Sequence, residues 1–229
     1  LAGYSKNCIE IANSFFRFIN IRTIIVNSLE EAELIKLTNN SFRDHIFSFS
    51  NAISYLCDNF NINSFELIKK ANEGYPRDKI PLPSPGVGGI CLSKDPYLLE
   101  NSFIKKTKIF KKINVGHNSR DINSKGAKFL LWSYNKFKKK YYPNKKIKVF
   151  IIGIAFKGFP ETSDIRFSTS IDFIKLLNNK ETNIRVYDPF VKLKEINNLK
   201  LKHTNIANGF KNASAVFILN NHPDYSKLN

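Results

Sequence analysis

The sequence predicts an α/β protein in which a long central helical region precedes a Rossmann-like domain built on a parallel sheet. Residues 28–60 contain neither glycine nor proline, as a long helix requires. From Lys148 onward, apolar runs typical of buried strands alternate with a helical pattern. Residues 1–27 add one helix–strand unit with no sheet of its own to join, so we expect the fold to be truncated at both ends.

The first half of the chain contains most of the predicted helices. Residues 8–19 have helical periodicity, and residues 22–27 ("RTIIVN") have the composition of a strand. Ser28 and Glu31 form a capping-box pair, from which a helix is predicted to run to about Phe60. Further helices are predicted at 65–73, 96–114 and 124–142.

The second half carries the elements of the predicted sheet. In order, we expect a buried strand at 148–156, a helix at 168–179, and strands at 183–188 and 214–220. This alternation is typical of βαβ units, in which the strands run parallel. Only three strands are predicted before residue 229.

Composition limits the classes of function. The chain has 229 residues, with 36 lysines and arginines against 19 aspartates and glutamates, and a formal net charge of +17. Because lysine is spread along the chain together with abundant Asn, Ile and Phe, we attribute the charge to compositional bias. A nucleic-acid-binding surface is the alternative. The densest basic run, 136–148, is expected to follow the polar face of a helix and its exit loop.

The sequence also bears on the location of the protein in the cell and on the state of its three cysteines. No apolar run approaches the length of a membrane span and no signal peptide opens the chain, so we expect a soluble, cytoplasmic protein. Since the chain contains no methionine, we expect Leu1 to lie inside a longer protein. The wide spacing of the three cysteines favours free thiols over a disulfide framework or a metal site. We expect Cys8 and Cys57 to be buried structural cysteines.

The stretch "PSPGVGGICLSKDPYLL" at 83–99 distinguishes Cys91 from the other two cysteines. Its glycines leave room for a ligand close to the backbone. The Asp-Pro pair at 95–96 suits the start of a helix, whose free N–H groups favour an anion such as a thiolate, and Lys94 adds a positive charge. These features predict a lowered thiol pKa and a nucleophilic Cys91. The alternative is a buried structural cysteine.

Three separated motifs together resemble the UDP-glucose/GDP-mannose dehydrogenase family. The stretch at 83–99 resembles the family's active-site cysteine loop, and "EAELIKLTNNSFRD" at 31–44 resembles its central helix. "IIGIAFKGFPETSDIRFS" at 151–168 resembles the signature of its C-terminal domain, which "YDP" at 187–189 and "NNHPDY" at 220–225 continue. The resemblance implies an NAD-dependent enzyme that oxidises the C6 alcohol of a nucleotide sugar twice, to a uronic acid.

Within the family, the cysteine loop and "SFRD" are most similar to members that act on UDP-N-acetylhexosamines, with UDP-N-acetyl-D-mannosamine as the expected substrate. Two positions depart from the family pattern. Ile90 precedes the cysteine where many members have histidine or proline, and Ala52 follows Asn51 where glutamate is common. A UDP-sugar-binding protein that keeps the fold without catalysis is the alternative.

The resemblance implies catalytic roles for four residues. Cys91 would attack the aldehyde that the first hydride transfer produces, and a second transfer would leave a thioester for water to hydrolyse. Lys36 and Asn40, which their four-residue spacing places on one helix face, would stabilise the developing oxyanion. Asp95 would handle protons or position the hydrolytic water.

Other matched positions are expected to bind rather than react. The resemblance implies substrate contacts at four residues: Arg77, Gly88, Gly89 and Lys157. Of these, Lys157 would contact the UDP phosphates, and Arg77 would reach the substrate of a neighbouring subunit. Lys94 and Arg166 would contact NAD. No metal site is predicted.

The resemblance also implies a domain division. In this family an NAD-binding domain precedes the central helix, and the 229 residues contain no G-x-G-x-x-G fingerprint after a strand. Residues 1–27 would be the tail of that domain, 28–120 a central dimerisation domain with the cysteine loop, and 121–229 an incomplete UDP-sugar-binding domain. We expect a homodimer through the long helix. We also expect the 229-residue chain alone to bind a UDP-sugar weakly, without binding NAD tightly or oxidising a substrate.

Overall fold

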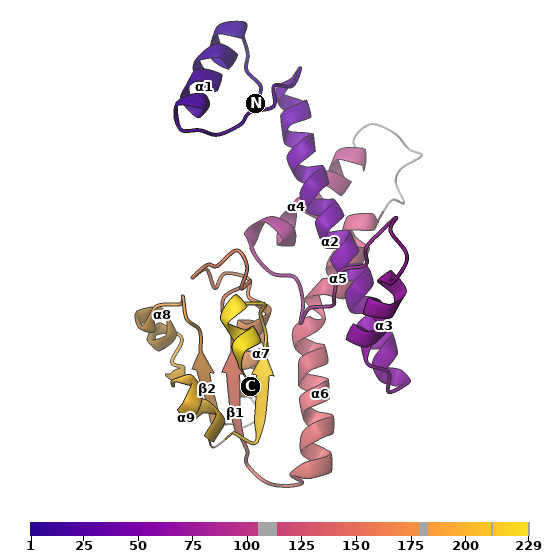
Figure 1. The fold of residues 1–229 in the computed structure, drawn as a ribbon, viewed down its shortest axis with the longest axis vertical. Helices are drawn as coiled ribbons and strands as arrows, with labels where there is room; N and C mark the ends of the chain where they lie inside the picture. Colours follow the sequence, from indigo (N-terminus) through magenta and orange to yellow (C-terminus); the bar gives the residue numbers. More distant parts are fainter. Residues whose placement is uncertain (105–113, 179–182, 212, 229) are drawn as a thin grey trace.

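The computed structural model describes residues 1–104, 114–178, 183–211 and 213–228. Helix α1 (Lys6–Phe18) lies at one end of an elongated molecule and a four-stranded sheet lies at the other, with the long helix α2 (Leu29–Asn59) leading from one toward the other (Figure 1). Within the described residues, no helix is both long and apolar enough to cross a membrane.

In the described part of the helical half, four further helices follow: α3 (Ser64–Asn72), α4 (Ile90–Ile104), α5 (Val115–Ser124) and α6 (Gly126–Tyr141). Helices α2, α4 and α5 pack against one another. The predicted helices at 8–19, 28–60, 65–73 and 124–142 are confirmed. Helix α5 was not predicted because the side chains on its buried face are polar, so it lacks apolar periodicity.

The start of α2 agrees with the predicted capping box. The Ser28 side chain accepts a hydrogen bond from the backbone N–H of Glu31 at 3.1 Å. The Glu31 carboxylate accepts one in return from the backbone N–H of Asn27 at 2.8 Å, one residue before the cap itself. Two N–H groups at the start of the helix region are thereby satisfied.

The strand predicted at 22–27 is wrong, since these residues form no strand. A strand requires a neighbouring strand to accept its N–H groups. This segment instead makes two hydrogen bonds with the first residue: the Leu1 amino group donates to Ile24 O at 2.6 Å, and Val26 N donates to Leu1 O at 3.0 Å. A strand-like composition was therefore not enough to make residues 22–27 a strand.

The helix predicted at 96–114 begins earlier than expected, and its predicted part at 105–113 lies outside the described residues. Gly89, with φ of +88°, ends the preceding loop, and its carbonyl oxygen accepts from Ser93 N. Helix α4 therefore begins at Ile90, and Pro96 lies inside its second turn. The Asp-Pro pair at 95–96 is not the helix start, so Cys91 itself lies in the first turn.

The sheet is entirely parallel, with strand order β3-β2-β1-β4. Its strands are β1 (Lys148–Ile152), β2 (Asn183–Tyr187), β3 (Lys202–His203) and β4 (Ala215–Ile218). The three predicted strands are confirmed, with the first ending at Ile152 rather than 156. Strand β3 was not predicted because two exposed residues give no pattern to detect.

Side chains of β1 alternate between two cores, as the period of a strand requires. Val149 and Ile151 pack into the larger core with α6 and α7 (Thr169–Asn178). Phe150 and Ile152 face the other side of the sheet, where Tyr225 of a 3-10 helix (Pro223–Lys227) covers them. The short helices α8 (Leu193–Asn198) and α9 (Ile206–Lys211) also belong to this Rossmann-like domain. The predicted fold class is confirmed.

Candidate active site

One face of α2 is polar and buried. Asn40, Asp44, Ser48 and Asn51 follow one another at helical spacing, and all four are buried. Lys36 lies one turn before Asn40 and is exposed. Because α4 and α5 pack against α2, this helix presents hydrogen-bonding groups to its neighbours.

Asp95 joins α2 to α4, the helix that also contains Cys91. Its Oδ2 accepts a hydrogen bond from Asn40 Nδ2 at 2.6 Å, and its Oδ1 accepts one from Lys94 Nζ at 2.7 Å. Burial alone would raise the pKa of Asp95. The hydrogen bonds from Lys94 and Asn40, together with nearby lysine charges, outweigh burial and hold the pKa below its ordinary value. The hydrogen bond to Asp95 in turn raises the pKa of Lys94. The pair is therefore fully ionised at neutral pH.

The three cysteines lie in different environments. Cys91 is exposed in the first turn of α4, where backbone N–H groups lack partners within the helix. Cys57 is buried, as predicted. The prediction that Cys8 is buried is wrong: Cys8 is exposed on α1, a helix with no buried residue. Exposure of Cys91 removes the alternative of a buried structural cysteine, while its nucleophilic role stays a prediction.

The glycines before Cys91 are in close contact with the C-terminal domain. A Cβ atom at Gly88 would lie 2.0 Å from the carbonyl oxygen of Phe167, and one at Gly89 would lie 2.8 Å from the Phe156 ring. Gly89 N also donates to Phe167 O at 3.4 Å. These glycines are therefore required by packing within the chain, and their substrate-binding role stays a prediction.

Comparison with known families identifies this arrangement. Residues 30–124 match the central domain of the UDP-glucose/GDP-mannose dehydrogenase family, and residues 150–229 match the UDP binding domain of the same family. The chain belongs to this family.

Individual relatives agree with this assignment. The chain is 33% identical over 232 residues to a UDP-N-acetyl-D-mannosamine dehydrogenase of Campylobacter jejuni, covering 100% of the chain and 54% of the relative. It is 26% identical over 229 residues to an NDP-N-acetyl-D-galactosaminuronic acid dehydrogenase of Ralstonia nicotianae, covering 100% of the chain and 51% of the relative.

Solved structures of family members have the same fold. The structure of the Pyrococcus horikoshii UDP-D-ManNAc dehydrogenase superposes with a TM-score of 0.77 at 29% identity, over 100% of this chain and 51% of that one. The UDP-N-acetyl-mannosamine dehydrogenase of Staphylococcus aureus gives a TM-score of 0.77 at 30% identity, over 98% of this chain and 50% of that one. The chain thus spans about half the length of the relatives it matches.

In this dehydrogenase-family chain, the remaining predicted residues lie at different places. Lys157 follows β1, and its Nζ lies 5.6 Å from the centroid of the Phe156 ring, the same ring that Gly89 contacts. Arg166 is exposed and makes a bidentate ion pair with Asp164, and this hydrogen bonding lowers the pKa of Asp164. Arg77 is exposed between α3 and the cysteine loop. Asp95, four residues after Cys91 on α4, accepts hydrogen bonds from Asn40 and Lys94 and feels the charge of Lys36. Lys157 and Gly89 both lie against the Phe156 ring.

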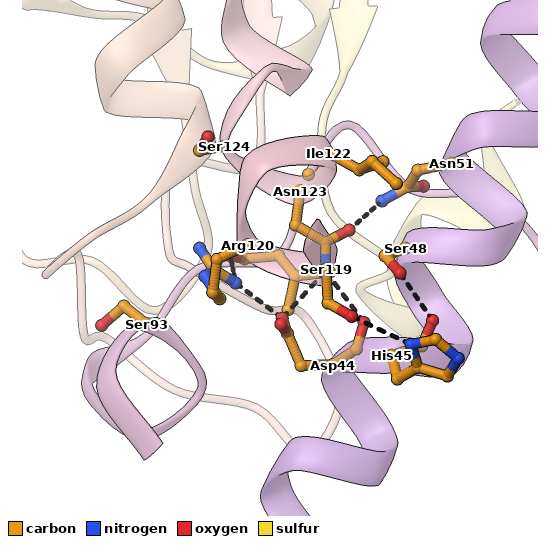
Figure 2. Close-up of polar contacts among 12 residues, drawn as sticks. Asp44, His45, Ser48, Asn51, Ser93, Ser119, Arg120, Ile122, Asn123 and Ser124 are labelled. Atoms are coloured by element: carbon orange, nitrogen blue, oxygen red, sulfur yellow. Dashed lines mark hydrogen bonds and ion pairs between the residues drawn. The ribbon is translucent and has the colours of Figure 1, made fainter. Parts of the chain in front are cut away.

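Sequence reasoning missed a buried polar network beside this site (Figure 2). Arg120 of α5 pairs with Asp44 of α2 at 2.6 Å, and both side chains are almost fully buried. Burial raises the pKa of Asp44, while the charge and hydrogen bond of Arg120 act against that rise. Asn123 also donates to Asp44 Oδ1, at 2.8 Å. Polar residues at four-residue spacing along α2, otherwise rich in apolar residues, were the signal that could have revealed this network.

The cluster of charges favours chemistry at a carbonyl group. An exposed sulfur at a helix start can act as a nucleophile, and the lysine ammonium groups and the Asn40 amide can donate to an oxygen that becomes negative. Asp95 stays ionised between two donors and can accept a hydrogen bond from water.

Proposed function

We propose that this chain is the catalytic and UDP-binding part of a nucleotide-sugar 6-dehydrogenase whose substrate is UDP-N-acetyl-D-mannosamine. One observation carries the proposal: exposed Cys91 lies one helical turn from buried Asp95, which is hydrogen-bonded to Asn40 of another helix. The names of the relatives from Campylobacter jejuni and Pyrococcus horikoshii support the substrate.

In the proposed reaction, Cys91 acts on the aldehyde formed by the first oxidation. The thiolate sulfur adds to the carbonyl carbon, a C–S bond forms, and the carbonyl oxygen becomes an oxyanion. Lys36 and one N–H of the Asn40 amide donate to this oxygen, while the other N–H of Asn40 stays on Asp95. After the second oxidation gives a thioester, water attacks, the C–S bond breaks, and the thiolate returns to Cys91. Asp95 orients this water and accepts its hydrogen bond.

The proposed cofactor is NAD, of which two molecules, bound one after the other, would each accept one of the two hydrides. Lys94 and Arg166 are the residues of this chain proposed to contact it. Their exposed cationic groups, each held by a neighbouring carboxylate, suit the phosphates of a dinucleotide. The fingerprint that cradles the pyrophosphate does not occur among the 229 residues, so these two contacts lie at the edge of the cofactor. Lys157, at the carboxyl end of β1, is proposed to bind the UDP phosphates, with Gly88 and Gly89 beside the substrate.

We also propose that two copies pair through α2. The helix exposes large apolar side chains along its length: Leu34, Ile35, Phe42, Phe49 and Leu56. A two-fold interface is the commonest way to cover such surfaces. The role of Arg77, reaching the substrate of a neighbouring subunit, is proposed from the family resemblance and requires this dimer. Light scattering of the full-length protein at micromolar concentration is expected to give twice the mass of one polypeptide. A monomer would contradict both the dimer and the role of Arg77.

The function is tested in the polypeptide encoded by the complete reading frame. With UDP-N-acetyl-D-mannosamine and NAD, we expect two NADH per sugar and a uronate product. Cys91→Ala is expected to abolish uronate formation while UDP-sugar binding, measured by calorimetry, is kept. Cys8→Ala serves as the matched control and should leave turnover unchanged. Near-normal NADH formation by Cys91→Ala would refute the nucleophile, and binding without any oxidation by the wild type would favour the non-catalytic alternative.

Calorimetry on the 229-residue chain tests the domain division at 1–27, 28–120 and 121–229. We expect weak binding of UDP, because Lys157 follows a strand of the parallel sheet, and no tight binding of NAD. The boundary after residue 120 falls inside α5, so the helical and sheet parts are best expressed together. Micromolar NAD affinity would show that the cofactor site lies within these residues.

A further inference from the structure

A buried arginine joins the central helix to the cysteine loop. The Nη1 atom of Arg120 donates to Asp44 Oδ1 at 2.6 Å and to the carbonyl oxygen of Val87 at 3.1 Å. The Arg120 side chain is 8% exposed and that of Asp44 is 0% exposed. Because Val87 precedes Cys91 by only four residues, this atom fixes the loop backbone immediately before the proposed nucleophile.

A second attachment holds the loop three residues earlier. Asn51 Oδ1 accepts from Ser84 N at 2.9 Å, and Asn51 Nδ2 donates to Asn123 Oδ1 at 2.9 Å. Asn123 in turn donates to both the side chain and the backbone carbonyl of Asp44. Figure 2 shows Asn51, Asn123, Asp44 and Arg120 meeting between α2 and α5. The two attachments are therefore parts of one network.

The geometry assigns this network a positioning role. We propose that Asp44, Arg120, Asn51 and Asn123 hold the loop that leads into Cys91 in a fixed position relative to Lys36 and Asn40. Lys36, Asn40 and Asp44 stand at four-residue intervals on one helix, so a loop fixed to Asp44 is also fixed relative to the other two. The consequence for catalysis rests on the proposed function, whereas the position of the loop does not.

Hydrogen bonding explains why this interior is polar. Apolar side chains of similar size would fill the same space without the cost of burying two charges. They would not fix the backbone groups of Ser84 and Val87, because apolar contacts have no preferred direction. Buried donors and acceptors give the loop one orientation, as a reacting sulfur requires.

Two variants of the 229-residue chain test the proposal. Arg120→Lys keeps the charge, but the shorter lysine side chain lacks the Nη1 atom that donates to both Asp44 and Val87. Asn51→Ala removes the second attachment without changing any charge, so it remains informative if Arg120→Lys does not fold. The control is Lys125→Ala, which breaks an exposed ion pair with Asp121 immediately after α5.

The first readout is amide hydrogen exchange of a peptide covering 84–94, with helix content checked by circular dichroism. We expect exchange of this peptide at least several-fold faster in Arg120→Lys and Asn51→Ala than in the wild type, and unchanged in Lys125→Ala. Unchanged exchange in either of the two test variants, at wild-type helix content, would overturn the positioning role.

The second readout is the rate of alkylation by iodoacetamide at Cys91, with exposed Cys8 in the same sample as reference. In the wild type we expect Cys91 to react faster than Cys8, and in both test variants its rate should move toward that of Cys8. If the exchange changes but the Cys91 rate stays at its wild-type value, the loop does not position the sulfur and the proposal is refuted. If Cys91 and Cys8 react equally fast in the wild type, the activated nucleophile of the proposed function fails, and the exchange result still decides the role of the network.

Discussion

The two halves of this chain bury different kinds of side chain. In the C-terminal domain, residues on both faces of the sheet are aliphatic or aromatic, as Ile151, Phe173 and Phe150 illustrate. Where α2 meets α4 and α5, the buried residues include Asn40 and Asp44 together with their hydrogen-bonding partners. Both interiors are buried, one with apolar side chains and the other with hydrogen-bonded polar ones.

The two kinds of interior contribute differently: apolar burial mainly stabilises the fold, whereas buried hydrogen bonds mainly fix the orientation of the groups that they join. Burial of apolar area stabilises a domain by about 25 cal/mol per Å² regardless of direction. A hydrogen bond contributes only about 1 kcal/mol net, but its geometry is strict, and breaking it leaves a costly buried group. We infer that the sheet domain supplies the stable base, while the polar interface of the helical half sets the angles of the proposed active site.

The largest expected effect comes from the apolar core. Phe173 of α7 is fully buried, and its ring lies 4.9 Å from that of Phe217. Phe173→Ala should reduce the free energy of unfolding by about 3–5 kcal/mol, because it removes apolar contacts and leaves a cavity. Denaturant unfolding followed by circular dichroism measures this change. Leu193→Ala, at an exposed position of α8, is the control and should stay within about 0.5 kcal/mol. A small effect of Phe173→Ala would contradict the stabilising role of this core.

The buried ion pair is expected to behave differently. Arg120→Met leaves the Asp44 carboxylate buried without its partner and should cost about 3 kcal/mol or more. Adding Asp44→Leu removes the remaining charge, so the double variant should recover most of that stability while the loop at 84–94 stays released. The same denaturant experiment on both variants gives the answer. A double variant as unstable as the single one would mean that the pair itself stabilises the fold.

The sequence predicted elements that depend on local patterns and missed those that depend on distant partners. Ser28 and Glu31 marked the start of α2 because a capping box is complete within four residues. Cys91 was placed outside α4 because the Asp-Pro pair at 95–96 is favoured at helix starts, whereas Gly89 actually ends the loop. The candidate site was inferred from the family resemblance. Its support by Arg120 could not be inferred, since the bonds to Asp44 and Val87 join segments far apart in the chain.

A smaller effect is expected at the start of α2, where neither interior is involved. Ser28→Ala removes the acceptor for Glu31 N and should cost about 1 kcal/mol. Hydrogen exchange of the first turn of α2 should become faster, while exchange of the loop at 84–94 should not change. Ser28→Asp is the matched control, since an aspartate can accept the same hydrogen bond. Faster exchange in the cysteine loop would show that the end of α2 is coupled to the polar network.

The smallest difference is expected from Asp95, and only in acid. Because the folded-state pKa of Asp95 is lower than its ordinary value, the folded protein binds this proton less readily than the unfolded chain. The resulting stability is present above the ordinary pKa of an aspartate and is lost as the pH falls through the lower folded-state value. Asp95→Asn has no such proton, so its stability should fall less steeply over this acid range than that of the wild type. Thermal melts at a series of acid pH values compare the two slopes, with Asp121→Asn, an exposed aspartate on α5, as the control. Equal slopes in wild type and Asp95→Asn would mean that Lys94 and Asn40 do not hold this carboxylate in its ionised form, and the polar interior would then lose its link to the proposed active site.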